Sequence, residues 1–127
     1  MDNKKPKILI IEDESDISEA LRLRLEANGY DVITSSDGVE GLHKAHAERP
    51  DLIILDIRLP KMDGYKVCRM LKFDEEYSST TVIILTARIQ PSDIAMGKEV
   101  GADEYMTKPY RSEELLAKIK QYLVVEG

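Results

Sequence analysis

The sequence has one cysteine, no tryptophan and only one phenylalanine. Because Cys68 has no second cysteine to pair with, a disulfide scaffold is excluded and a reducing compartment is indicated. No apolar run approaches the ~20 residues that a membrane-spanning helix needs. The polar start, Met1 to Lys7, lacks the apolar core of a signal peptide. We therefore expect a cytoplasmic protein that does not contact a membrane.

Basic clusters and a glycine-rich turn are also missing. The formal net charge is -6, from 18 basic and 24 acidic side chains. Binding to nucleic acid depends on neutralising phosphates, so direct nucleic-acid binding is not expected. The first apolar run is followed by the acidic segment Glu12-Asp13-Glu14-Ser15. A dinucleotide-binding fold would need a glycine-rich turn there, which argues against that class.

Neither a repeat nor a low-complexity segment nor a linker divides the chain. Its 127 residues fit one domain of ordinary size. We expect a single domain over residues 1–127, which is either free-standing or cut from a longer protein.

Short apolar runs alternate with helix-like stretches along the chain. The first, third and fourth runs are continuous and rich in β-branched residues, as strands covered on both faces are. The second and fifth are shorter and more polar, as edge strands are. The predicted strands are Lys7–Ile11, Asp31–Thr34, Leu52–Leu55, Val82–Thr86 and Glu104–Thr107.

Helical spacing of apolar residues follows each predicted strand. Ser15 is the expected N-cap of the first helix, which ends at Asn28-Gly29. Asp37 and Glu40 resemble a capping pair at the start of the second helix. The other helix boundaries are indicated by Arg49-Pro50, Asp63-Gly64, Pro91, Gly101 and Ser112.

This alternation predicts a three-layer α/β fold, in which helices cover both faces of a parallel sheet through right-handed crossovers. In such sheets ligands bind beyond the carboxyl ends of the strands. Polar residues follow four of the predicted strands at that edge: Glu12 and Asp13, Asp56, Thr86, and Lys108 with Pro109.

Three carboxylates would meet at this edge. Glu12, Asp13 and Asp56 would repel one another unless a cation or a proton balances them. Mg²⁺ suits the cluster because it is a hard ion that prefers oxygen ligands and keeps several waters. With Lys108 as a fixed positive charge and Thr86 as a hydroxyl donor, these are the parts of a phosphoryl-transfer site. Asp56 is the carboxylate that could become an aspartyl phosphate.

Each residue also has an ordinary structural interpretation. Asp56 could form a turn or cap a helix, and Glu12-Asp13 could be a solvated loop. Thr86 could be a β-branched strand residue and Lys108 a surface lysine. The functional interpretation is favoured because polar side chains follow four separate strands at the same edge of the sheet. Under the structural interpretation this arrangement would be a coincidence.

The chain resembles the receiver domains of two-component response regulators over nearly its whole length. That resemblance implies a flavodoxin-like (βα)5 fold, a five-stranded parallel sheet with strand order 2-1-3-4-5. The matching segments are Ile8 to Glu14, Asp51 to Asp56 with Leu59-Pro60 and Met62-Asp63-Gly64, Ile83 to Ala87, Gly101 to Tyr105, and Thr107 to Tyr110.

The resemblance also implies how the site binds a metal and a phosphoryl group. Asp56 would be the phosphoacceptor. Asp13, Asp56 and the backbone carbonyl of Arg58 would bind Mg²⁺ directly, and Glu12 would bind it through a water. Mn²⁺ is expected to substitute for Mg²⁺. Lys108 would hold the phosphoryl oxygens.

Three further expectations come from the same resemblance. Thr86 and Tyr105 would be the residues that move when the phosphoryl group arrives, and the Lys108–Pro109 peptide bond would be cis. Arg58 and Arg88 flank the site, and they either tune the lifetime of the phosphoryl group or lie in solvated loops.

The implied partners are a sensor histidine kinase or phosphotransfer protein as donor, and a downstream effector protein or domain. The implied chemistry is self-phosphorylation and autodephosphorylation, so we do not expect an enzyme in the usual sense. A homodimer through the fourth helix, fifth strand and fifth helix is a further expectation. The candidates for charge pairs across it are Asp103, Glu104, Arg111 and Lys118.

Two other classes of function compete with this interpretation. The first is a degenerate receiver that serves only as a protein-binding module, which would not need the complete set of site residues. The second is an aspartyl phosphohydrolase, many of which need an Asp two residues after the nucleophile. Here that position is Arg58, which cannot deliver a proton at neutral pH.

Overall fold

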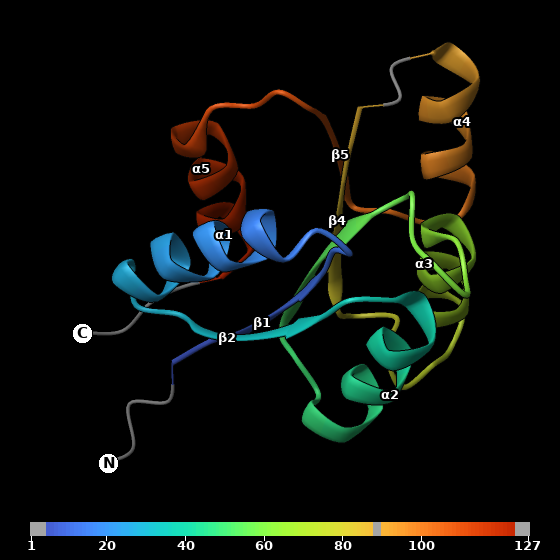
Figure 1. The fold of residues 1–127 in the computed structure, drawn as a ribbon. Helices are drawn as coiled ribbons and strands as arrows, with labels where there is room; N and C mark the ends of the chain where they lie inside the picture. Colours follow the sequence, from blue (N-terminus) through green and yellow to red (C-terminus); the bar gives the residue numbers. More distant parts are fainter. Residues whose placement is uncertain (1–4, 88–89, 124–127) are drawn as a thin grey trace.

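A computed structural model of the chain describes residues 5–87 and 90–123 (Figure 1). Within these residues, five parallel strands form one sheet in the order β2-β1-β3-β4-β5, which confirms the predicted fold. The strands are β1 (Lys7–Ile11), β2 (Asp31–Ser35), β3 (Leu52–Asp56), β4 (Thr81–Thr86) and β5 (Glu104–Thr107). The helices are α1 (Ser15–Ala27), α2 (Gly38–Glu48), α3 (Gly64–Lys72), α4 (Pro91–Glu99) and α5 (Ser112–Tyr122).

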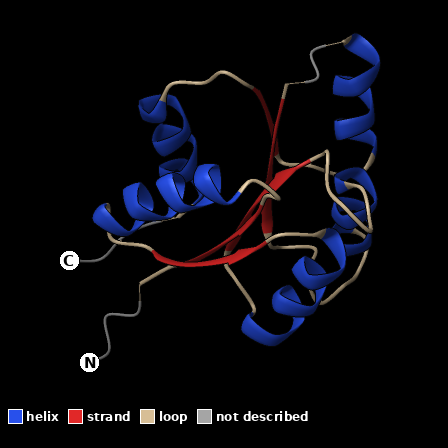
Figure 2. Cartoon of the chain, viewed as in Figure 1, coloured by secondary structure: helices blue, strands red, loops and turns tan. Residues whose placement is uncertain are grey.

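The helices form two layers on opposite faces of the sheet (Figure 2). Helices α2 and α3 share one apolar core with the sheet, and α1 and α5 share the other. Alternate residues of β1 supply the two cores, because successive side chains of a strand point to opposite faces. Leu9 and Ile11 belong to the first core, and Ile8 and Ile10 belong to the second. The central strands are therefore apolar on both faces, as their continuous runs predict.

The helix starts depend on side-chain caps in two cases. Asp37 Oδ1 accepts from the backbone N–H of Glu40 at 2.8 Å, which confirms that part of the predicted capping pair. Asp63 Oδ1 accepts in the same way from the backbone N–H of Lys66 at 3.1 Å. Such caps typically contribute about 1 kcal/mol each.

The prediction that Ser15 caps α1 is wrong. Glu14 is the N-cap residue, its backbone is extended, and its side chain makes no capping hydrogen bond. The Glu14 carbonyl instead accepts from the N–H groups of Ile17 and Ser18. Glu12 Oε2 accepts from the Glu14 N–H at 3.2 Å. This bond satisfies the backbone at Glu14, so Ser15 is already the first helical residue.

The connection between α3 and β4 packs at the amino ends of the strands. Tyr77 is buried, and its hydroxyl lies 2.6 Å from Nδ1 of His46. Cys68, in the adjoining helix, is also buried, and burial raises the pKa of its thiol to about 12. The interpretation of Cys68 as a small buried apolar residue is therefore confirmed. Within the described residues, no helix is both long and apolar enough to cross a membrane.

Candidate functional site

The strand register brings the predicted site residues to one edge of the sheet. Ile11 pairs with Leu55, so Glu12 and Asp56 follow at the same level of neighbouring strands. Thr86 pairs with Thr107, which places Lys108 beyond the end of β4. The backbone N–H of Lys108 donates to the carbonyl of Thr86 at 2.8 Å. The geometry therefore gathers Glu12, Asp13, Asp56, Thr86 and Lys108, although they come from four strands.

Lys108 bridges two of the acids. Its Nζ atom lies 2.9 Å from Oε1 of Glu12 and 2.9 Å from Oδ2 of Asp56. The exposed fraction of the side chain is 6% for Glu12, 13% for Asp56 and 23% for Lys108. The charges are partly shielded from water, so their interactions are stronger than those of surface ion pairs. The Lys108–Pro109 peptide bond is cis.

The three acids form a compact oxygen cluster. One carboxylate oxygen from each of Glu12, Asp13 and Asp56 lies within 4.8 Å of the other two. Lys108 balances only part of this negative charge. Hard oxygen donors at such spacing, with Asp13 exposed to solvent, fit a divalent cation that keeps some of its water ligands. The residues present therefore fit Mg²⁺.

The pKa shifts reflect burial and the shared lysine. Burial raises the pKa of Glu12, and the hydrogen bonds from Lys108 and the Glu14 N–H only partly offset this. For Lys108, burial lowers the pKa, but the hydrogen bonds to Asp56 and Glu12 outweigh that effect and raise it overall. Lys108 therefore stays protonated at neutral pH, and a nearby positive charge favours the ionised form of Glu12.

The backbone around Asp56 is closely packed. The N–H of Arg58 donates to Asp56 Oδ1 at 3.2 Å, and the side chain of Arg58 is exposed. The N–H of Gly64 donates to the carbonyl of Ile57 at 2.9 Å. A Cβ atom on Gly64 would lie only 2.3 Å from the carbonyl oxygen of Asp56. Residue 64 must therefore lack a side chain for α3 to begin where it does.

The two residues expected to move lie on the neighbouring strands β4 and β5. Thr86 is buried, with 1% of its surface exposed, and Tyr105 is half-buried. The ring of Tyr105 packs on Gly97 of α4, where a Cβ would lie 2.6 Å from Cδ2 of the ring.

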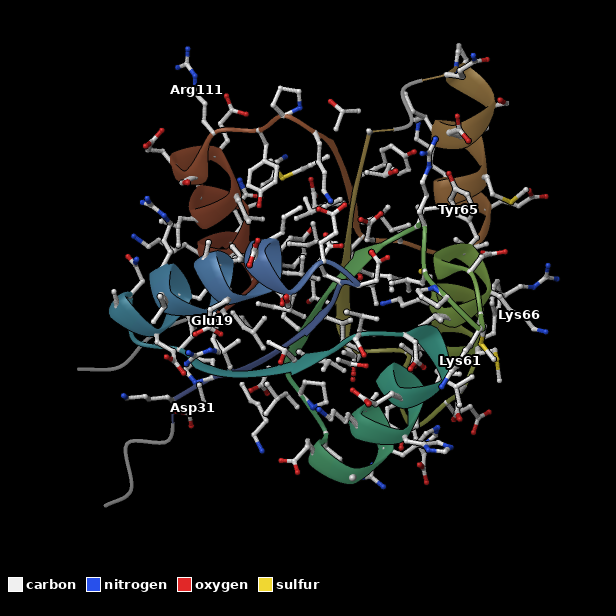
Figure 3. All side chains as sticks on the ribbon, viewed as in Figure 1. Glu19, Asp31, Lys61, Tyr65, Lys66 and Arg111 are labelled. Carbon is white, nitrogen blue, oxygen red and sulfur yellow. The ribbon has the colours of Figure 1, made fainter. Side chains whose placement is uncertain are left out.

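Tyr105 has a partner that the sequence did not predict. Tyr65 lies near the start of α3 (Figure 3). Its hydroxyl is 3.3 Å from the hydroxyl of Tyr105. It also donates to the carbonyl of Asp93 in α4 at 3.0 Å. An aromatic residue directly after Asp63-Gly64 was the only available signal for this contact.

The candidates for charge pairs between subunits are mostly paired within the chain. Asp103 accepts from Lys72 Nζ at 3.0 Å. Glu104 accepts from Lys118 Nζ at 2.8 Å and from the Tyr122 hydroxyl at 2.7 Å. Arg111 lies at the N-cap of α5 and is exposed. Arg88, which was expected to flank the site, lies outside the described residues.

Comparison with known proteins gives a family match. The model of the response regulator receiver domain matches residues 8–120. The alkaline phosphatase synthesis transcriptional regulatory protein PhoP of Bacillus subtilis (strain 168) is 47% identical over 117 residues, which are 92% of this chain and 48% of that protein. The DNA-binding dual master transcriptional regulator RpaA of Synechocystis sp. is 45% identical over 118 residues, which are 93% of this chain and 49% of that protein.

A solved structure agrees with the family match. Chemotaxis protein CheY4 of Vibrio cholerae superposes with a TM-score of 0.88 at 32% identity, over 94% of this chain and 100% of that one. The chain belongs to the response regulator receiver domain family. It is a receiver of two-component phosphorelay signalling, a class of phosphoacceptor switches rather than conventional enzymes. The chain spans about half the length of the curated relatives it matches.

Proposed function

We propose that Asp56 accepts a phosphoryl group from a sensor histidine kinase or phosphotransfer protein, and that Mg²⁺ is required. The observation that supports Asp56 is the bridge of Lys108 Nζ to both Glu12 and Asp56, above a cluster of three carboxylates. The residues that would hold the ion are Asp13, Asp56, the backbone carbonyl of Arg58 and, through a water, Glu12. Mn²⁺ would serve in its place.

The chemistry follows from the groups present. A carboxylate oxygen of Asp56 attacks the phosphorus of a phosphohistidine, an O–P bond forms, and the N–P bond to the donor imidazole breaks. Lys108 stabilises the charge that the phosphoryl oxygens carry, and the Thr86 hydroxyl donates to them. The bound metal ion would supply further charge stabilisation for the same oxygens. Hydrolysis of the acyl phosphate later restores Asp56. The activity is thus self-phosphorylation and autodephosphorylation.

The phosphoryl group would act on the face formed by α4 and β5. Added charge at Asp56 draws Thr86 toward it, and Tyr105 follows. The new arrangement of this face then controls a downstream partner protein or an effector domain, a two-state equilibrium that a local charge event biases. A homodimer through α4, β5 and α5 is one form this control would take, with Arg111 as the exposed basic residue available to it.

We regard residues 1–127 as one receiver domain that works in the cytoplasm. PhoP and RpaA are named as transcriptional regulators. We do not assign nucleic-acid contact to this domain itself, because its net charge is -6.

The test is an intact-mass measurement after incubation with acetyl phosphate or phosphoramidate, with and without Mg²⁺. We expect one phosphoryl adduct that requires Mg²⁺ and is lost in Asp56→Asn. Asp51→Asn is a matched control, because Asp51 lies at the other end of the same strand, where it accepts from the backbone N–H of Lys7. That variant should be phosphorylated normally. Absence of an adduct from small donors and from histidine kinases would overturn the proposal and favour a protein-binding module.

A further inference from the structure

Tyr65 joins three elements of the fold through one hydroxyl group. It is the second residue of α3 and is half-buried. Its hydroxyl donates to the carbonyl of Asp93 in the first turn of α4 and lies 3.3 Å from the hydroxyl of Tyr105 on β5. Figure 3 shows Tyr65 between the upper end of α3 and α4. The same group therefore contacts both elements of the proposed output face.

A short path connects Tyr65 to the phosphoacceptor. Gly64, its neighbour in sequence, is pressed against the carbonyl oxygen of Asp56 and donates its N–H to Ile57. A shift of the backbone at Asp56 must therefore move Gly64 or break this packing. Tyr65 follows Gly64 directly in the chain. A shift at Asp56 that moves Gly64 would therefore also move Tyr65 and its hydroxyl.

Within the described residues, helix α4 buries little of its surface. Gly97 is its only residue that is buried within the described chain. The large side chains of Ile94 and Met96 are exposed. A helix without a buried apolar face is held weakly, so a hydrogen bond at its first turn has a large effect on where it lies.

Asp56 Oδ2 accepts directly from Lys108 Nζ, and a phosphoryl group on Asp56 would displace this contact. We propose that Tyr65 is a positioning residue that holds α4 and Tyr105 in the arrangement of the unphosphorylated chain, and that phosphorylation of Asp56 switches the output face by breaking the Tyr65–Tyr105 and Tyr65–Asp93 contacts. This inference rests on the proposed function of Asp56, and it adds a second connection to the one through Thr86.

The ordinary alternative is that the Tyr65 hydroxyl only satisfies nearby polar groups. The substitution Tyr65→Phe separates the two interpretations, because it removes the hydroxyl and keeps the ring. Tyr77→Phe is a matched control. It also removes a hydroxyl that forms a hydrogen bond, to His46, but at the amino ends of the strands.

The first measurement is amide hydrogen exchange in the unphosphorylated full chain. We expect Tyr65→Phe to speed exchange in the first turn of α4 by about fivefold, the ratio that corresponds to one lost neutral hydrogen bond. Tyr77→Phe should leave α4 unchanged. Equal exchange of α4 in wild type and Tyr65→Phe would overturn the proposal.

The second measurement is a titration with beryllofluoride and Mg²⁺ as a phosphoryl mimic, read from the NMR amide signal of Gly97. Because Tyr65 stabilises the unmodified arrangement, Tyr65→Phe should reach half-conversion at about a fifth of the wild-type concentration. In the double variant with Tyr105→Phe the two effects should be less than multiplicative, since both substitutions remove the Tyr65–Tyr105 contact. An unchanged or raised midpoint, or effects that multiply in the double variant, would overturn the proposal.

The two proposals fail in different ways. If the wild-type chain forms no phosphoryl adduct, the proposed function of Asp56 is wrong. If the adduct forms in wild type and in Tyr65→Phe, but Tyr65→Phe then behaves like Tyr77→Phe in both measurements, only the inference about Tyr65 is wrong.

Discussion

Lys108 Nζ lies 2.9 Å from Oδ2 of Asp56, although the two residues are 52 positions apart in the chain. One is at the end of β3 and the other follows β5, so the lysine side chain reaches across the end of β4. This ammonium group would lie close to the oxygens of a phosphoryl group on Asp56 and would stabilise their negative charge.

Removal of that charge should slow phosphorylation. We expect Lys108→Met to reduce the rate of adduct formation on Asp56 by about 10²–10³-fold, the usual effect of losing one stabilising donor. Time-resolved intact mass with phosphoramidate measures this. Lys61→Met is the control, since Lys61 is exposed and pairs with Asp37 instead. Equal rates for Lys108→Met and Lys61→Met would contradict the role of Lys108.

Binding of Mg²⁺ should stabilise the fold through the acid cluster. At a Mg²⁺ concentration ten times the Kd, the free energy of unfolding should rise by about 1.4 kcal/mol. Asp13→Asn should abolish most of this gain, because Asp13 supplies one of the three clustered carboxylates. Asp31→Asn, an exposed acid at the amino end of β2, should keep it. Urea unfolding with and without Mg²⁺ is the measurement, and equal gains in the two variants would argue against this metal site.

The two close glycine contacts predict different costs of adding a methyl group. In Gly64→Ala the new Cβ would meet the backbone oxygen of Asp56, which cannot move alone. We expect a loss of about 1–3 kcal/mol in stability and slower phosphorylation. In Gly97→Ala the Cβ would meet the side chain of Tyr105, which can rotate away. The phosphorylation rate should then stay near wild type. The opposite order of effects would show that Gly64 does not position Asp56.

The ion pair between Glu104 and Lys118 predicts a stability effect that depends on pH. Hydrogen bonds from Lys118 and then from Tyr122 lower the pKa of Glu104 below its ordinary value of 4.5. Because the pKa of Glu104 is lower in the folded chain, its contribution to stability is fully present at a pH above the pKa of the unfolded chain. That contribution disappears as the pH falls through the pKa of the folded chain.

Glu104→Gln should therefore cost about 0.5–1 kcal/mol at pH 7 and almost nothing at a pH well below 4.5. Chemical unfolding at the two pH values measures the difference. Glu113→Gln, at an exposed position in the first turn of α5, is the control. If the cost of Glu104→Gln were the same at both pH values, the ion pair would not be its origin.

Much of the fold was predictable because its strongest signals are local. Continuous β-branched runs identified β1, β3 and β4 as central strands, and polar residues at their ends located the candidate site. The strand ends differ from the prediction by one residue at Ser35, Asp56 and Thr81, because pairing with a neighbouring strand extends each of them.

The remaining features depend on contacts between distant segments. The capping residue of α1 is Glu14 rather than Ser15, because Glu12 holds its N–H from the preceding strand end. The sequence shows that Glu104 and Lys118 carry opposite charges. Only the position of α5 beside β5 shows that they pair within one chain. The reach of Tyr65 to Tyr105 likewise depends on how α3, α4 and β5 lie together.

The separation of the apolar interior into two cores has a consequence for how such a domain tolerates change. The sheet separates the two cores, so a displacement of α3 and α4 on one face need not shift α1 on the other. Substitutions in one core should accordingly add to those in the other without interaction. One side of the molecule can then change its packing while the other side keeps its own.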